Sequence, residues 1–195
     1  MNMLDAIMSA RSSFFALVAL GTAMSFAGAA PAAADYDSGI RDYEANRHIT
    51  AIAEFRRLAE RGHGAAEFMI GVMYFNGSGV AKDTGVAAAW FHKAAMQAYP
   101  PAQLAYGSLH LRGVGLAPDP VAAYMWLALV ANSGVPGLAI QATTLHDAAA
   151  KALNPADLER ARRLARDWRP RCAKLSGPWE GGARDSFGPC GSGAG

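Results

Sequence analysis

Residues 66–100, AEFMIGVMYFNGSGVAKDTGVAAAWFHKAAMQAYP, are followed by a second version of the same pattern at 102–136, AQLAYGSLHLRGVGLAPDPVAAYMWLALVANSGVP. The two stretches align without a gap at an offset of 36 residues. A fixed period of this length is typical of stacked supersecondary units, none of which can bury its apolar face alone. The positions that are identical in both copies are Ala66/Ala102, Gly71/Gly107, Gly77/Gly113, Gly79/Gly115, Ala81/Ala117, Asp83/Asp119, Ala87/Ala123, Trp90/Trp126, Ala95/Ala131 and Pro100/Pro136.

Each copy has the pattern of two helices separated by a glycine-rich turn. Ala66, Ile70 and Tyr74 recur at the spacing of one helix face. Asp83 and Asp119 are suited to cap the second helix, and a proline follows Asp119 at the first helical position. No stretch shows the sustained β-branched alternation of a strand. We therefore predict an all-α fold, a right-handed α-solenoid of stacked antiparallel helix pairs.

The flanking sequence continues this scheme in edited form, as expected for end units that must face water. The predicted solenoid covers 35–168: an N-terminal helix pair at 35–64, repeats at 65–100 and 101–136, and a capping pair at 137–168. Residues 169–195 are rich in Gly, Pro and Ser, and we predict a disordered tail there. The core candidates outside the repeats are Tyr43, Ala51, Ala53, Phe55 and Leu58 upstream and Leu158, Ala161, Leu164, Ala165 and Trp168 downstream.

The first 34 residues have the features of a signal peptide. The apolar run Phe14–Phe26 is shorter than the ~20 residues that a spanning helix needs, which disfavours the alternative of an uncleaved anchor. Alanines at Ala32 and Ala34 satisfy the small-x-small rule, so we place the cleavage between Ala34 and Asp35. No cysteine lies near this point, which excludes a lipoprotein. We expect an exported protein, periplasmic or secreted.

The composition permits a packed core and excludes some classes of function. The chain is 52% hydrophobic and 17% charged, and its 18 Lys and Arg against 16 Asp and Glu give a net charge of +2. This near-balance gives no support to nucleic-acid binding. Two cysteines cannot form an all-Cys zinc site or a dense disulfide framework. Cys172 and Cys190 could pair with each other in an oxidising compartment, and intermolecular pairing or free thiols remain open.

Positive charge is concentrated near the C-terminal end of the predicted solenoid. Between 160 and 174, seven basic residues stand against one acid, Asp167. One interpretation is a solvated outer helix face, with cations favoured near the helix C-terminus. The other is docking to an anionic surface, such as membrane lipid, an acidic polysaccharide or an acidic partner. The candidate basic surface consists of Arg160, Arg162, Arg163, Arg166, Arg169 and Arg171.

The repeated residues resemble the Sel1-like repeats, which are relatives of the tetratricopeptide repeats. The second copy departs from the family pattern at His110, where Tyr is usual, and at Leu129-Val130, where Lys-Ala is usual. The closing segment up to Trp168 is similar to that of bacterial exported Sel1-like proteins, so the resemblance covers about 36–168. The matching residues of the first copy are Ala66, Ile70, Gly71, Tyr74, Gly77-Ser78-Gly79-Val80, Asp83, Ala87, Trp90 and Lys93-Ala94-Ala95.

The resemblance implies a non-catalytic adaptor whose concave face, lined by the first helix of each unit, binds a protein or peptide partner. We place the groove positions with Gly71, Gly107 and Thr143 as anchors, although the pattern expects a glycine at the last of these. Three of the apolar candidates could instead pack between helices, namely Phe68, Leu104 and Ile140. For Asn76, Ser108 and Arg112 we expect the groove or solvent. The full set is Phe68, Val72, Phe75, Asn76, Leu104, Ser108, Leu111, Arg112, Ile140, Thr144 and Asp147.

Catalytic, metal and cofactor sites lack support in the sequence. Gly-x-Ser-x-Gly, Ser-x-x-Lys, His-Glu-x-x-His and Cys-x-x-Cys are absent. Some Sel1-like proteins with paired cysteines in each repeat are discussed as β-lactam-binding or β-lactam-hydrolysing, but these repeats lack such cysteines. His110 and His146 occupy equivalent positions on successive first helices, and we expect His110 to be hydrogen-bonded rather than metal-bound. We predict no metal, no cofactor and no small-molecule substrate.

Overall fold

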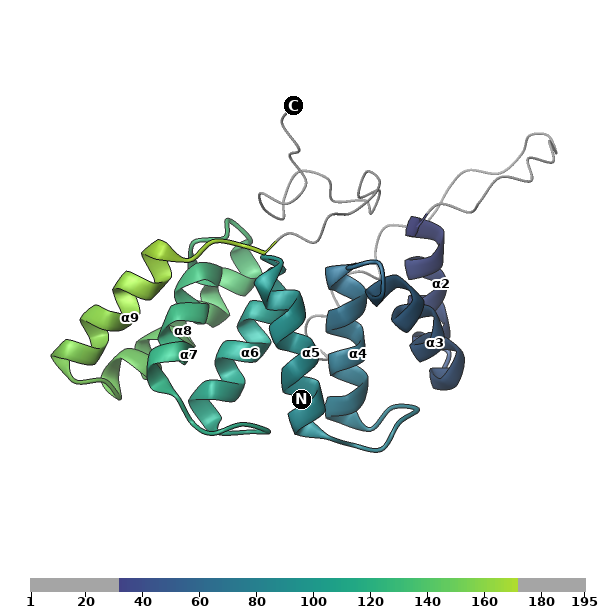
Figure 1. The fold of residues 1–195 in the computed structure, drawn as a ribbon, viewed down its shortest axis with the longest axis horizontal. Helices are drawn as coiled ribbons and strands as arrows, with labels where there is room; N and C mark the ends of the chain where they lie inside the picture. Colours follow the sequence, from purple (N-terminus) through teal and green to yellow (C-terminus); the bar gives the residue numbers. More distant parts are fainter. Residues whose placement is uncertain (1–31, 172–195) are drawn as a thin grey trace, which may run out of the picture.

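The computed structural model describes residues 32–171, with side chains from residue 36 onward. From α2 to α8 each helix packs against the next one along the chain, and α9 packs against α7 (Figure 1). No strand occurs in the described part of the chain, and the prediction of an all-α solenoid of helix pairs is confirmed. The helices are α2 (Ala32–Glu44), α3 (His48–Ala59), α4 (Gly64–Asn76), α5 (Thr84–Met96), α6 (Pro100–Arg112), α7 (Pro120–Ala131), α8 (Pro136–Lys151) and α9 (Pro155–Asp167).

Polar side chains fix the starts of the second helices. The Asp83 carboxylate accepts two backbone N–H groups from the first turn of α5, both at 2.9 Å. Asp119 accepts one from the first turn of α7 at 3.0 Å, and Asn154 accepts one from α9 at 2.9 Å. These bonds satisfy N–H groups that have no partner within a helix. The predicted caps at Asp83 and Asp119 are confirmed.

A glycine on the first helix of each repeat allows the second helix to approach closely. A Cβ atom at Gly71 would lie 2.6 Å from the ring of Phe91, and one at Gly107 would lie 2.9 Å from Leu127. Phe91 and Leu127 are 36 residues apart, and both are almost completely buried. The close contact therefore fills the centre of each pair with one large apolar side chain.

The N-terminal pair, α2 and α3, also has a glycine that lets its two helices approach closely, although the turn between them is shorter. A Cβ atom at Gly39 would lie 2.6 Å from the Phe55 ring, and Phe55 stands 36 residues before Phe91. Ala51 and Leu58 are also buried as predicted. Ala53 is exposed, so its predicted core position is wrong: it lies opposite the face that α3 turns toward α2 and α4.

The glycine-rich turns join neighbouring units. A Cβ atom at Gly79 would lie 2.6 Å from His48, at the start of α3, and one at Gly115 would lie 2.1 Å from the carbonyl oxygen of Thr84, at the start of α5. Gly115 lies 36 residues after Gly79, and Thr84 lies 36 residues after His48, so the two contacts are equivalent. Each turn therefore rests on the second helix of the preceding unit, and only glycine leaves room for it.

The C-terminal segment crosses back over the solenoid after α9. The ring of Trp168 lies 5.8 Å from that of Trp126 on α7, and the backbone N–H of Arg171 donates to the carbonyl of Met96 at 2.7 Å. The predicted tail therefore begins too early at 169, because residues up to Arg171 are tied to α5. Leu164 is 44% exposed, so its predicted core position on α9 is also wrong.

Some predictions concern residues outside the described part of the chain. These include the apolar run Phe14–Phe26 and the possible pairing of Cys172 with Cys190. Helix α2 includes both Ala34 and Asp35, on either side of the predicted cleavage point. Within residues 32–171, no helix is both long enough and apolar enough to cross a membrane.

Burial of His63 makes stability depend on pH. Its Nδ1 atom accepts the backbone N–H of Ala66 at 3.2 Å and caps α4, and its ring stacks on Tyr36. Burial lowers the pKa of His63 below its ordinary value of 6.5. The unfolded chain therefore binds a proton that the folded chain excludes, and the free energy of unfolding falls as the pH drops below 6.5.

We expect His63→Asn, which keeps an acceptor at the cap, to make this loss of stability with acidification shallower. The measurement is urea unfolding of both proteins at about pH 7.5 and about pH 5.5. If the unchanged protein and the variant lose the same stability over this pH range, His63 is not a source of the pH dependence.

Candidate functional site

Four of the predicted groove residues are not accessible to a partner. Phe68, Val72, Leu104 and Ser108 are 5%, 6%, 0% and 3% exposed. The ring of Phe68 packs against Phe91 at 5.4 Å between ring centroids. These positions belong to the core, so their assignment to an open groove is wrong.

The reason is that α4 and α6 are enclosed by their neighbours. Every residue of α4 from 64 to 73 is buried, and between 100 and 109 on α6 only Tyr106 escapes full burial. The Ser108 hydroxyl, expected in the groove or in solvent, donates to the Leu104 carbonyl of its own helix at 2.7 Å. Helices α4 and α6 therefore offer only their last turns to a partner.

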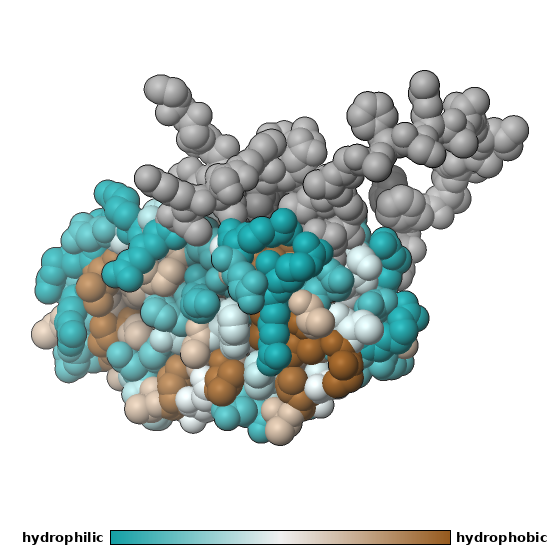
Figure 2. Space-filling model, turned by 45° about the vertical axis from the view of Figure 1, so that its right-hand side comes forward, coloured by the Kyte–Doolittle hydropathy of each residue, from teal (hydrophilic) through white to brown (hydrophobic). Residues whose placement is uncertain are grey.

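The accessible remainder lies at the C-terminal ends of α4 and α6. Phe75 and Leu111 are half-buried there, and Asn76 and Arg112 are exposed. We call these four residues the first-helix edge. Lys82 extends beside it, with its Nζ atom 5.8 Å from the centre of the Phe75 ring. Apolar groups reach the surface along this lower rim of the molecule (Figure 2).

Helix α8, the first helix of the third unit, is more exposed to solvent than α4 and α6. Ile140 is 71% exposed, so the alternative that it packs between helices is wrong. Thr144 and Asp147 are exposed as well, and their assignment to a groove stays a prediction. His146 is half-buried: its ring lies 4.1 Å from that of Tyr124, and its Nδ1 atom lies 3.3 Å from the Asp147 carboxylate.

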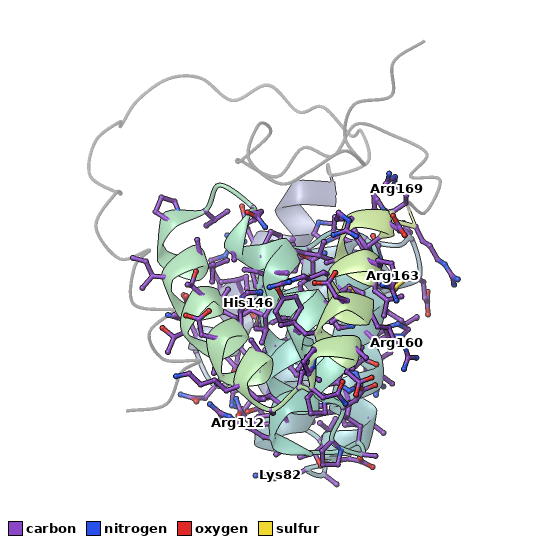
Figure 3. The ribbon with its side chains drawn as sticks, turned by 90° about the vertical axis from the view of Figure 1, so that its left-hand side faces the viewer. Lys82, Arg112, His146, Arg160, Arg163 and Arg169 are labelled. Atoms are coloured by element: carbon purple, nitrogen blue, oxygen red, sulfur yellow. The ribbon has the colours of Figure 1, made fainter. Side chains whose placement is uncertain are left out.

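The predicted basic residues are all exposed along α9 and the segment after it. Arg162 pairs with Glu159 at 2.6 Å. The Arg169 guanidinium, from the segment after α9, donates to the carbonyl groups of Arg166 and Trp168, at 3.0 and 2.7 Å, at the C-terminal end of α9. Arg160 and Arg163 project from α9, and Arg169 projects from the segment after it (Figure 3). The exposed set is Arg160, Arg162, Arg163, Arg166, Arg169 and Arg171.

A cluster of aromatic and histidine rings joins α5, α6, α7 and the C-terminal segment. No local sequence motif indicates this cluster. The ring of Tyr106 lies 5.0 Å from His92, 4.6 Å from His110 and 5.6 Å from Trp126. Burial is the main cause that lowers the pKa of both histidines. These rings come from positions spread over 92–168, so only folding brings them together.

The prediction of a hydrogen-bonded His110 is not confirmed at its Nδ1 atom. Among the described residues this buried atom has no hydrogen-bond partner, and the ring packs edge-on against Tyr106. Across the described residues, no group of three or more His, Cys, Asp or Glu side chains is placed to hold a metal ion.

Helix pairs that repeat at 36 residues, with glycine contacts within and between units, define an α-solenoid repeat protein. A profile of the Sel1 repeat matches residues 64–99 and 100–135. The chain therefore carries two Sel1 repeats, and the predicted resemblance is confirmed. Sel1 repeats typically serve as scaffolds for protein–protein interaction and are generally non-catalytic.

The solved structures that are similar to this chain include the following two. One is c5321, a protective antigen of uropathogenic Escherichia coli with an SLR fold: the TM-score is 0.65 and the identity 28%, over 71% of this chain and 30% of that one. The other is a Sel1 repeat protein from Oxalobacter formigenes, with a TM-score of 0.53 and 24% identity over 69% of this chain and 54% of that one. This chain thus spans well under two thirds of either protein. No curated protein matches it.

Proposed function

We propose that this protein is an exported, non-catalytic adaptor that binds a partner protein or peptide through the exposed ends of its first helices. The observation that carries this proposal is the first-helix edge, where Phe75 and Leu111 are only half-buried beside exposed Asn76 and Arg112. Half-buried apolar groups next to polar ones are typical of binding surfaces. The small-x-small pattern at Ala32 and Ala34 supports export.

The rigidity of the repeats suits this role. Each unit is fixed to the next by its glycine turn, so the edge residues of successive units keep a constant spacing. A partner that contacts both units therefore meets a surface that is organised before binding, which lowers the entropy cost of association.

The test is crosslinking inside the cell with a photo-crosslinking residue in place of Leu111. We expect one dominant protein adduct, because Leu111 is a half-buried apolar residue of the first-helix edge. The matched control carries the same residue at Ala53, which is exposed on α3 away from the edge. Equal adducts at both positions would contradict the adaptor proposal.

The exposed arginines of α9 favour a second candidate function, association with an anionic membrane or polysaccharide of the cell envelope. Within the described residues, Arg160, Arg163 and Arg166 have no ion-pair partner. If this second function is correct, a crosslinking residue at Leu111 gives no protein adduct. The protein is then retained in the envelope fraction, and high salt releases it. Neutralising Arg162, Arg163 and Arg166 would then release the protein from the envelope fraction.

A further inference from the structure

The C-terminal strap, which we define as residues 168–171, leaves α9 and lies on the body of the solenoid. Its sequence is Trp-Arg-Pro-Arg. Trp168 has an extended backbone, with φ of −61° and ψ of 139°. Pro170 fixes its own φ and disfavours a helical conformation at the residue before it, so the strap is extended whatever it contacts. It runs back from α9 to the end of α5 (Figure 1).

The strap rests on a surface of three rings that come from both repeats. Tyr106 of α6 lies 5.0 Å from His92 of α5 and 5.6 Å from Trp126 of α7. His92 and Trp126 lie 6.2 Å apart, so the three rings are in mutual contact. We call them the inter-repeat ring surface. Trp168 packs edge-on against Trp126, with 5.8 Å between the ring centroids.

A backbone group at the end of α5 holds the other end of the strap. Met96 is the last residue of α5, so its carbonyl has no partner within the helix. The backbone N–H of Arg171 donates to this carbonyl at 2.7 Å. The charge of Arg171 is the second cause, after burial, that lowers the pKa of His92, which places the strap beside this ring as well. Trp168 and Arg171 thus fix the strap at its two ends.

The first repeat has the same tryptophan without a strap. Trp90 stands 36 residues before Trp126, and Lys93 of the same helix covers its ring, with the Nζ atom 4.3 Å from the ring centre. Lys93 corresponds to Leu129, which brings no cation to Trp126. Trp126 is nevertheless 4% exposed, whereas Trp90 is only partly buried. The second repeat thus has the indole of Trp168 on its tryptophan in place of a lysine.

Few polar contacts hold the strap in place. Among the described residues, the bond from Arg171 to Met96 is the only hydrogen bond between the strap and helices α2 to α8. Arg169 donates to carbonyls of Arg166 and Trp168, which belong to α9 and to the strap itself. The Nε1 atom of Trp168 is buried without a hydrogen-bond partner. Release of the strap would return this N–H group to water, which lowers the cost of opening.

We propose that the inter-repeat ring surface and the Met96 carbonyl form a second peptide-binding site, which the strap occupies in cis and which a partner protein fills with an extended Trp-x-Pro segment of its own. The inference rests on the proposed adaptor function and names one kind of partner segment. The strap shows what the site accepts: an indole on Trp126, a proline that keeps the backbone extended, and an N–H group for the carbonyl. The strap and the partner therefore compete, and only the open form binds the partner.

The test is the binding of a fluorescent peptide with the sequence of residues 164–171, LARDWRPR, measured by anisotropy with the full chain and with its Trp168→Ala variant. We expect the variant to bind the peptide about tenfold more tightly, because its site is no longer occupied by the strap. The same peptide with alanine in place of tryptophan should bind to the variant about tenfold more weakly.

Circular dichroism shows whether each variant is folded. If Trp168→Ala does not fold, Arg171→Pro takes its place in the same experiments. This substitution removes the N–H group that donates to Met96 and keeps the indole. We expect it to tighten peptide binding by about threefold.

A further substitution, Leu129→Lys in the Trp168→Ala background, tests where the peptide binds. The new ammonium group should take the position over Trp126 that Lys93 has over Trp90, and we expect peptide binding to weaken by about tenfold. The matched control is Ala53→Lys in the same background. It adds the same charge at an exposed position of α3 and should change binding by less than about twofold.

Equal binding of the peptide to the unchanged chain and to the variant with the opened strap overturns the inference. Equal binding of the two peptides, or no effect of Leu129→Lys, also overturns it. A dimer that Trp168→Ala abolishes would show that the strap exchanges between two copies of this chain, and would overturn it as well. A protein captured at Leu111, together with strap variants that bind the peptide no better, would leave the adaptor function standing and reject this site alone.

Discussion

Gly115→Ala should lower the free energy of unfolding by about 3 kcal/mol or more. The new Cβ atom would lie 2.1 Å from the carbonyl oxygen of Thr84, a backbone atom that cannot turn aside. The turn must therefore lift away from α5, at a cost in the upper part of the 1–3 kcal/mol range of overpacking. The left-handed conformation at Gly115, with φ of +73°, adds about 1 kcal/mol.

Gly134→Ala is the matched control, because Gly134 has nearly the same φ, +74°, and nothing within 4 Å of a Cβ atom. It should cost about 1 kcal/mol, from backbone strain alone. Urea unfolding followed by circular dichroism measures both variants. If the two variants lose the same stability, the turn does not hold neighbouring units together.

Phe91→Ala should cost about 3–5 kcal/mol, and Arg163→Ala no more than about 0.5 kcal/mol, because the first side chain is buried and the second is exposed. Phe91 is 2% exposed and fills the space beside Gly71. Its removal leaves a cavity at the centre of the pair. Arg163 is exposed and has no partner within the described residues, so its removal leaves nothing unpaired.

The same urea titrations measure these variants, and Leu127→Ala serves as the reference for the second unit. Leu127 is fully buried, so we expect it to follow Phe91, at about 2–5 kcal/mol. A large loss for Arg163→Ala would contradict the expectation that an exposed side chain of α9 contributes little to stability.

The repeat period made most of the fold predictable. Asp83 and Asp119 marked the helix starts, and the 36-residue offset located the pairs to within a few residues of their observed ends. The candidate site was predicted less well. The resemblance to related repeats predicts a groove at Ser108 and Val72. The packing of the neighbouring helices instead buries α4 and α6 along most of their length.

The sequence by itself determined the helix pairs, their period and the small residues that let them approach, because periodicity and capping are local properties of the chain. Only the tertiary structure decided which of the repeated positions are covered. Leu104 and Ile140 are equivalent in sequence, yet one is buried and the other is 71% exposed. The physical reason is that burial depends on the neighbouring helix. Helix α7 closes against α6, whereas α9 packs against α7 and not against α8.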